Sequence, residues 1–197
     1  IDGNTRDAYY PYKGADESTV KKLPSAFFTV SMSDALSNIQ AFGNGSKLGS
    51  DGTGIDFFVN WDNNYLYLGW NGGNTNYSSD LYFAAIDIDP DGTNGITNDI
   101  LGVGFATGNP NPDFYVVYEN NENYYGVPAT NGNAFEVYNV SGGNWNWVSR
   151  TNGDDGTESQ IIFSGSGGEV RLRVPWSSLG GFTPGAGSKL GIVMWNN

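Results

Sequence analysis

One local pattern limits the fold more than any other: two runs rich in β-branched and aromatic residues, separated by three polar residues. The runs are residues 55–61 and 65–70, and Asp62, Asn63 and Asn64 lie between them. Asparagine tolerates the positive φ of the tight turns that join antiparallel strands. The sequence therefore predicts a β-hairpin over residues 55–70.

Similar short runs recur along the chain, with clusters of glycine, asparagine and proline between them; glycine alone supplies 29 of the 197 residues. Further strands are predicted at residues 26–32, 81–88, 114–118, 135–140, 145–148, 160–163, 169–174 and 190–195. Helix is predicted only as a turn or two at 33–39 and a single turn at 175–179, closed by Gly180. This spacing favours an all-β fold, a single antiparallel β-sandwich domain over residues 1–197.

Charge and composition exclude several classes of function. The nine lysines and arginines stand against 21 acidic residues, and the formal charge of -12 repels phosphate backbones, so we expect no nucleic-acid partner. The chain has no histidine and no cysteine, which excludes the Ser/His/Asp and Cys/His nucleophile systems, the usual zinc sites and disulfides. No apolar run approaches the roughly 18 residues that cross a bilayer. We expect a protein without enzymatic activity and without a membrane span.

The location is predicted from the start of the chain and from its asparagines. The chain begins at Ile1 rather than at methionine, which suggests a processed N-terminus or a cut chain. Asn-x-Ser sequons occur at Asn44, Asn76 and Asn139. Together with the acidic composition rich in asparagine and tyrosine, they predict an extracellular or cell-surface protein.

A series of motifs runs in order through nearly the whole chain. It comprises residues 1–3, residues 59–67 of the predicted hairpin, residues 80–87 with Gly95, and residues 169–180. In these motifs the chain resembles the family-9 carbohydrate-binding-module and DOMON-like superfamily, including the C-terminal domain of glucodextranase. The resemblance implies an antiparallel β-sandwich of jelly-roll type, found in secreted glycosidases and surface proteins, often with bound calcium and often non-catalytic.

The same resemblance implies a sugar site that is only half present. In that family the sugar lies between two aromatic platforms, and Tyr77 stands at the place of the first. The second has no counterpart, because the chain ends with residues 190–197 where the family continues through a further loop and a final strand. The missing strand would leave one sheet edge open, and the two-platform sugar clamp of that family would be incomplete.

Two tryptophans offer another carbohydrate platform. Trp145 and Trp147 alternate, so they share one face of the predicted strand, and a hairpin turn of Gly142, Gly143 and Asn144 precedes them. Paired aromatic rings can stack on sugars while a nearby amide such as Asn144 bonds to hydroxyl groups. Packing in the core is the competing interpretation of the pair.

An acidic run after the strand at 81–88 has the spacing of a calcium loop. Calcium prefers carboxylate and carbonyl oxygens, which this loop supplies without histidine or cysteine. The candidate ligands are Asp87, Asp89, Asp91, Asn94 and Asp99. The run lacks the closing glutamate of an EF-hand, and an acidic β-turn without a metal is the alternative. A second acidic loop, at residues 154–158, is interpreted as a solvated turn.

The N-terminal residues 1–24 form an extended segment in this interpretation. Tyr9, Tyr10 and Tyr12 lie in it, and their rings need a surface to cover. An open sheet edge recruits a strand, and a segment that crosses to the next copy joins molecules head to tail into a filament. We therefore expect a calcium-stabilised extracellular structural protein that self-associates into a filament, sheath or surface layer. The alternative is a carbohydrate-binding module of a polysaccharide-active protein.

Overall fold

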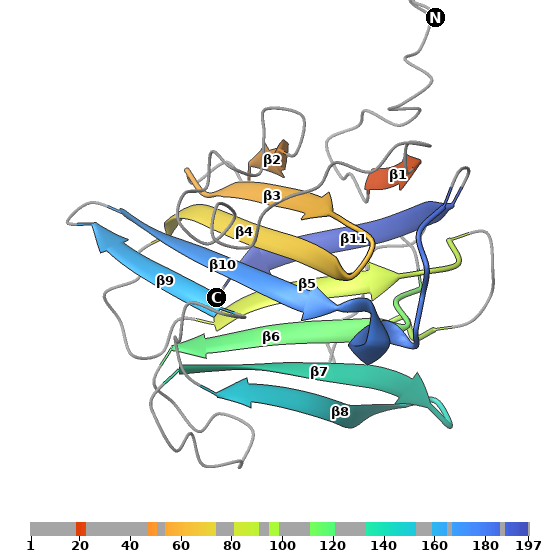
Figure 1. Cartoon of the computed structure of the whole chain (residues 1–197). Helices are drawn as coiled ribbons and strands as arrows, with labels where there is room; N and C mark the ends of the chain where they lie inside the picture. The colour runs from red at the N-terminus through yellow and green to blue at the C-terminus, as the bar shows by residue number, and fades with distance from the viewer. Residues whose placement is uncertain are drawn as a thin grey trace, which may run out of the picture.

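A computed structural model describes residues 19–22, 47–50, 54–73, 81–90, 95–98, 111–120, 133–152, 159–164, 167–185 and 188–196. Two antiparallel sheets face each other across an apolar core (Figure 1). The strands are β1 Thr19–Lys22, β2 Lys47–Ser50, β3 Asp56–Trp61, β4 Tyr65–Gly73, β5 Leu81–Asp87, β6 Phe114–Asn120, β7 Asn133–Ser141, β8 Asn144–Asn152, β9 Ser159–Ser164, β10 Gly167–Pro175 and β11 Lys189–Asn196. The predicted all-β sandwich is confirmed.

The order of hydrogen-bonded strands assigns each strand to one of the two sheets. One sheet has six strands in the order β1-β11-β5-β6-β7-β8, and the other has five in the order β2-β3-β4-β10-β9. β5 to β8 are neighbours both in sequence and in space, so this half of the larger sheet is an up-and-down run (Figure 1). The jelly-roll connectivity stays a prediction.

The β3–β4 hairpin forms where the sequence predicts it. The Oδ1 atom of Asp62 accepts hydrogen bonds from the backbone N–H groups of Asn64 at 2.7 Å and Tyr65 at 2.8 Å. This local bonding closes the turn, as aspartate commonly does. The short 3-10 helix η3, Trp176–Leu179, packs on the same turn, because the Trp176 indole donates to the Asp62 carbonyl at 2.9 Å. Gly180 ends η3 with a φ of 71°, as expected for the predicted single turn.

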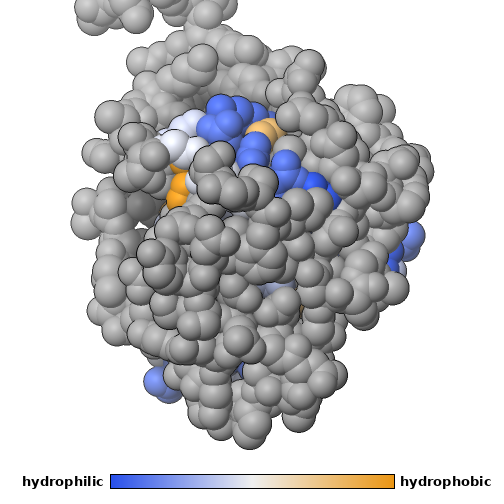
Figure 2. Space-filling view, turned by 90° about the vertical axis from the view of Figure 1, so that its left-hand side faces the viewer, coloured by the Kyte–Doolittle hydropathy of each residue, from blue (hydrophilic) through white to orange (hydrophobic). Residues whose placement is uncertain are grey.

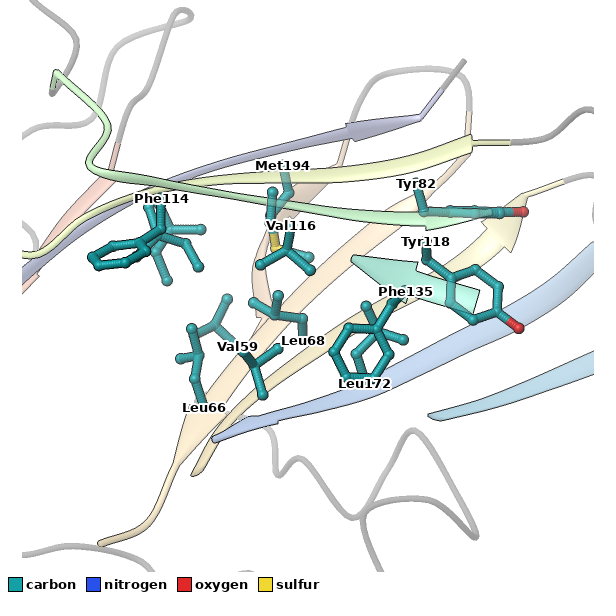
Figure 3. Packing of buried hydrophobic residues seen from close by; sticks show 14 of the residues in the cluster. Val59, Leu66, Leu68, Tyr82, Phe114, Val116, Tyr118, Phe135, Leu172 and Met194 are labelled. Atoms are coloured by element: carbon teal, nitrogen blue, oxygen red, sulfur yellow. The ribbon is translucent and has the colours of Figure 1, made fainter. Parts of the chain in front are cut away.

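The core lies between the two sheets and follows the two-residue period of the strands. Alternate residues of each central strand point inward and are almost fully buried. Figure 3 shows side chains of the two sheets pointing toward one another, with Val59, Leu66, Leu68 and Leu172 on one side and Phe114, Val116, Phe135 and Met194 on the other. Burial of these side chains is the main source of stability in a fold of this kind.

The outer face of the six-stranded sheet is also apolar. Phe83 of β5 stacks on Trp195 of β11 with ring centroids 5.2 Å apart, and it contacts Tyr115 of β6 at 5.8 Å. Phe83 and Tyr115 have no exposed surface. Every residue of β5 is buried, which explains why residues 81–86 form a continuous apolar run rather than an alternating pattern.

The N-terminal segment contributes an edge strand to its own sheet. β1 pairs antiparallel with β11, in the register Thr19 with Ile192 and Lys22 with Lys189. In this structure β11 therefore has a neighbour on each side, and the edge expected to stay open is covered by residues of the same chain. The sequence predicts neither β1 nor β2, which have only four residues each.

The remaining predicted strands within the described ranges are present, with their ends moved by a few residues. The strand predicted at 26–32 and the helical turns at 33–39 fall outside the described residues. In the part of the chain that the structure describes, no helix has the length and apolarity needed to cross a membrane. Figure 2 shows one side of the molecule, where the coloured residues are mostly hydrophilic around a small apolar group.

Candidate functional site

The β7–β8 hairpin carries the two tryptophans and turns as the sequence predicts. Gly142 and Gly143 have φ values of 60° and 75°. Two consecutive positive φ angles define a type I′ turn, whose twist matches that of the flanking strands. Neither glycine is close to a neighbour that would exclude a side chain, so glycine is needed here for the backbone conformation.

The two tryptophans lie on the same face but in different surroundings. Trp145 is half-buried against Tyr115, with ring centroids 5.4 Å apart, and its indole donates to the Asn98 carbonyl at 3.0 Å. Trp147 is 56% exposed and is the only large apolar side chain exposed among the described residues. Trp145 therefore belongs to the outer aromatic layer, and Trp147 is a free platform.

Exposed amides lie on the other face of the same strand. Asn144 donates through Nδ2 to the Gly142 carbonyl at 3.1 Å. Asn146 donates through Nδ2 to the carbonyls of Ser141 at 3.1 Å and Asn144 at 2.8 Å. These bonds hold both amides against the hairpin backbone, and they stabilise the turn that presents Trp147.

A buried ion pair lies on the same face, and sequence reasoning missed it. The Arg150 Nη1 atom of β8 is 3.2 Å from Glu136 Oε1 of β7, and the two side chains are only 8% and 1% exposed. The Tyr138 hydroxyl donates to the other oxygen of Glu136. Glu136 lies between Phe135 and Val137, which point into the core. A glutamate between two apolar residues of a predicted strand was the signal in the sequence for a charged group on the outer face.

The predicted calcium loop brings two of its five residues to a cluster of three carboxylates. Asp87 ends β5, Asp89 follows two residues later, and Asp113 immediately precedes β6; their carboxylate oxygens lie within 4.8 Å of one another. β5 and β6 are antiparallel, so the end of one lies beside the start of the other. Asp113 was missed, although an aspartate directly before the predicted strand at 114–118 was a visible signal.

Hydrogen bonds hold the carboxylates while burial opposes their charge. Asp113 Oδ2 accepts from the Ile88 N–H at 3.0 Å, and Asp87 Oδ1 accepts from the Asp89 N–H at 3.0 Å. Burial raises the pKa of Asp87 to about 7, the Asp89 N–H lowers it in part, and the charges of Asp113 and Asp89 raise it further. Burial also raises the pKa of Asp113. The cluster thus favours a proton or a cation that neutralises it.

The carboxylates and the tryptophan strand occupy the same end of the six-stranded sheet. The Asp113 carbonyl accepts from the Val140 N–H at 2.9 Å, and Val140 is the register partner of Trp145. Gly95 has a φ of 94° and lies so close to Asn111 that a Cβ atom would be 2.1 Å from its carbonyl oxygen. Residues 95–98 therefore connect the region before β6 with the Trp145 indole.

The other candidate residues cannot be placed. Those that lie outside the described residues are Tyr9, Tyr10, Tyr12, Tyr77, Asp91, Asn94 and Asp99, together with the acidic loop at 154–158. Comparisons with protein-family models, with curated proteins and with solved structures found no match. The resemblance to the family-9 and DOMON-like superfamily stays a prediction.

Proposed function

We propose that the chain is a non-catalytic, extracellular carbohydrate-binding domain in which Trp147 stacks on a sugar ring. The exposure of Trp147 carries the proposal. A tryptophan left 56% exposed on a strand, while almost every other large apolar side chain of the described sheets is packed, offers apolar area to a ligand.

The chemistry around Trp147 suits a neutral glycan. A sugar ring presents C–H groups to an aromatic face, and its hydroxyls stay at the rim in contact with water. Asn144 and Asn146 are exposed on the same strand but point to the face opposite Trp147, so the ring itself is the main contact. The only charged residue of β8, Arg150, is paired with Glu136. The formal charge of -12 repels acidic polysaccharides, so uncharged chains such as cellulose, xylan and α-glucans are the expected class.

Pull-down with these insoluble polysaccharides, followed by calorimetry with their soluble oligomers, tests the proposal. Trp147→Ala should weaken binding by about tenfold or more, which corresponds to about 1.4 kcal/mol. Trp147→Phe retains an aromatic plane and should recover much of the affinity. Wild-type protein that binds none of these glycans, or an alanine variant that binds as well as wild type, would contradict the proposal.

We also propose that calcium stabilises the domain through Asp87, Asp89 and Asp113. Three carboxylates within 4.8 Å supply the hard oxygen donors that calcium prefers. The buried position of Asp87 supports the proposal, since a cation would offset the cost of burying its charge. Calcium here would have a structural role, holding the β5–β6 connection near the tryptophan strand.

A second candidate function is a self-associating subunit of a filament, sheath or surface layer. One observation favours it: β8 is the longest of the edge strands, with nine residues, and in the described part of the chain only β7 pairs with it. Long unprotected edges recruit further strands. Electron microscopy of the purified protein with calcium tests this function, which requires ordered polymers rather than isolated particles or small oligomers.

A further inference from the structure

The backbone groups of β8 that face away from β7 can be identified from the hairpin geometry. The two residues that flank a type I′ turn, here Ser141 and Asn144, exchange hydrogen bonds with each other. Hydrogen-bonded and non-hydrogen-bonded pairs then alternate along an antiparallel ladder. Asn146 therefore bonds toward β7, while the N–H and C=O groups of Trp145 and Trp147 point away from the sheet.

A β-bulge limits how far this edge, which pairs with no described strand besides β7, is regular. The register between β7 and β8 shifts between Val137 and Tyr138, opposite Val148. A bulge twists the strand and interrupts further pairing beyond it. The regular part of the free edge is the stretch from Asn144 to Trp147, next to the turn.

The same stretch is neutral in a strongly acidic chain. No charged residue lies between Asn144 and Ser149, and Arg150 beyond them is held by Glu136. Two copies of a chain with a formal charge of -12 repel each other over most of their surface. The start of β8 is therefore a place where two copies can approach without bringing like charges into contact.

We propose that two copies of the chain pair antiparallel through the start of β8, across a two-fold axis at Asn146. In this register Trp145 of each copy lies opposite Trp147 of the other, and these are the residues whose backbone groups point outward. Four backbone hydrogen bonds form, two for each Trp145–Trp147 pair. A second copy fits this edge because the outward N–H and C=O groups of Trp145 and Trp147 are arranged symmetrically about Asn146. The pairing uses the same surface on both copies, so it gives a closed isologous dimer rather than a filament.

The dimer also completes an aromatic surface. Trp145 and Trp147 share the outer face, so the pairing places the exposed Trp147 ring beside Trp145 of the other copy, as aromatic cross-strand neighbours. The two copies then present one patch of four tryptophans, two on each of the paired strands. If glycans bind as proposed above, a long glycan chain would then contact both copies, and that consequence alone rests on the proposed function.

A single introduced cysteine tests the register, because the chain has no cysteine of its own. At the axis, Asn146 faces Asn146 of the other copy as a non-hydrogen-bonded pair, with Cα atoms about 4.5 Å apart, which suits a disulfide. Asn146→Cys should give a disulfide-linked dimer under mild oxidation. Asn144→Cys is the matched control, since its two copies would lie about 14 Å apart at the strand rise per residue. Cross-linking of both variants to the same extent, or of neither, would overturn the register.

Sedimentation equilibrium of the unmodified chain and of two variants at position 147 tests the pairing itself. Trp147→Ala and Trp147→Pro both remove the indole ring, but only proline also removes the N–H group that points away from β7. An edge strand tolerates proline at such a position. We expect a concentration-dependent dimer for the unmodified chain. The dissociation constant should rise about tenfold for alanine and at least tenfold again for proline. An unmodified chain that is monomeric at millimolar concentration overturns the dimer, even if it binds glycan, whereas a dimer without glycan binding contradicts only the proposed function.

Discussion

β1 and β8 border the same sheet, but they protect it in different ways. β1 has four residues, of which Lys21 and Lys22 are charged, and shortness and lysine are two common means of blocking an edge. β8 has nine residues, and its single charge is held inside by Glu136. The difference indicates that one side of the sheet is closed to further pairing, while the other side keeps a regular, uncharged stretch before its bulge.

The two edges also differ in what anchors them. β8 is fixed by the Glu136–Arg150 pair and by the Trp145 indole bond to the Asn98 carbonyl. In the neighbouring β7, the Val140 N–H donates a hydrogen bond to the Asp113 carbonyl. β1 is joined to the sheet by four register pairs with β11. The charged side chain of β8, Arg150, therefore lies in a buried ion pair with Glu136, and breaking a buried ion pair is costly.

The largest expected effect is the loss of the buried ion pair. Glu136→Ala should lower the free energy of unfolding by about 3–5 kcal/mol, because it removes the carboxylate that balances the charge of the buried Arg150 guanidinium. Urea unfolding measures the change. Lys21→Ala, at the opposite edge, is the comparison and should stay within about 0.5 kcal/mol. Equal losses at the two edges would show that the contrast in anchoring is wrong.

The second effect is a pH dependence of stability in calcium-free buffer with EGTA. The folded pKa of Asp87 is about 7, above its ordinary value of 3.8, so the folded state binds more protons than the unfolded state between these values. The contribution to stability is complete below about pH 4 and is lost as the pH rises through about 7. Each unit by which the pKa is raised corresponds to about 1.4 kcal/mol.

Asp87→Asn is the control for this titration, since the amide keeps the shape and carries no charge. Its stability should vary less between pH 4 and pH 7 than that of the unmodified chain. Thermal melts across that range measure both. A slope of the same size in the variant would assign the titration to another group.

The sequence predicted the strands well because their signals are local. The β3–β4 hairpin follows from Asp62 and two asparagines between β-rich runs, and the β7–β8 turn follows from two adjacent glycines. β1 and β2 were missed because four-residue strands such as Lys47–Ser50 have no alternation to detect. β2 forms by pairing with the next strand, β3, and β1 by pairing with the distant β11. Strand order is a long-range property that no local window contains.

The candidate site was predicted only where its residues are neighbours in sequence. Asp87 and Asp89 follow from spacing, but Asp113 joins them through the pairing of β5 with β6. Likewise the shared face of Trp145 and Trp147 follows from alternation, whereas their different exposure depends on Tyr115 of another strand. The chemistry of a site made by three strands needs their register, which only the structure supplies.

Calcium gives the third expected effect, and it sharpens the comparison of the edges. At a calcium concentration 100 times the dissociation constant, binding to the folded state adds about 2.7 kcal/mol, so EGTA should lower the melting temperature. Asp89→Ala should reproduce the EGTA effect. Asp56→Ala, which removes a partly exposed pair with Lys47 and a hydrogen bond from the Ser50 hydroxyl on the other sheet, should still respond to EGTA. In amide hydrogen exchange, EGTA should reduce protection at the β7–β8 hairpin more than at β1, because Asp113 bonds to Val140. An unchanged melting curve would rule out a stabilising calcium site.

The smallest effect on stability is expected at β1, and it tests whether lysine keeps that edge closed. The double variant Lys21→Thr, Lys22→Thr replaces both charges with a residue that strands favour, so the free energy of unfolding should change by no more than about 0.5 kcal/mol. The edge would lose its charge, however, and light scattering should then reveal aggregation at concentrations where the unmodified chain stays dispersed. Val20→Thr, which leaves both lysines in place, is the control and should not aggregate. If the double variant stays dispersed, the four-residue length of β1 is enough to block pairing, and its charge is not the cause of the contrast with β8.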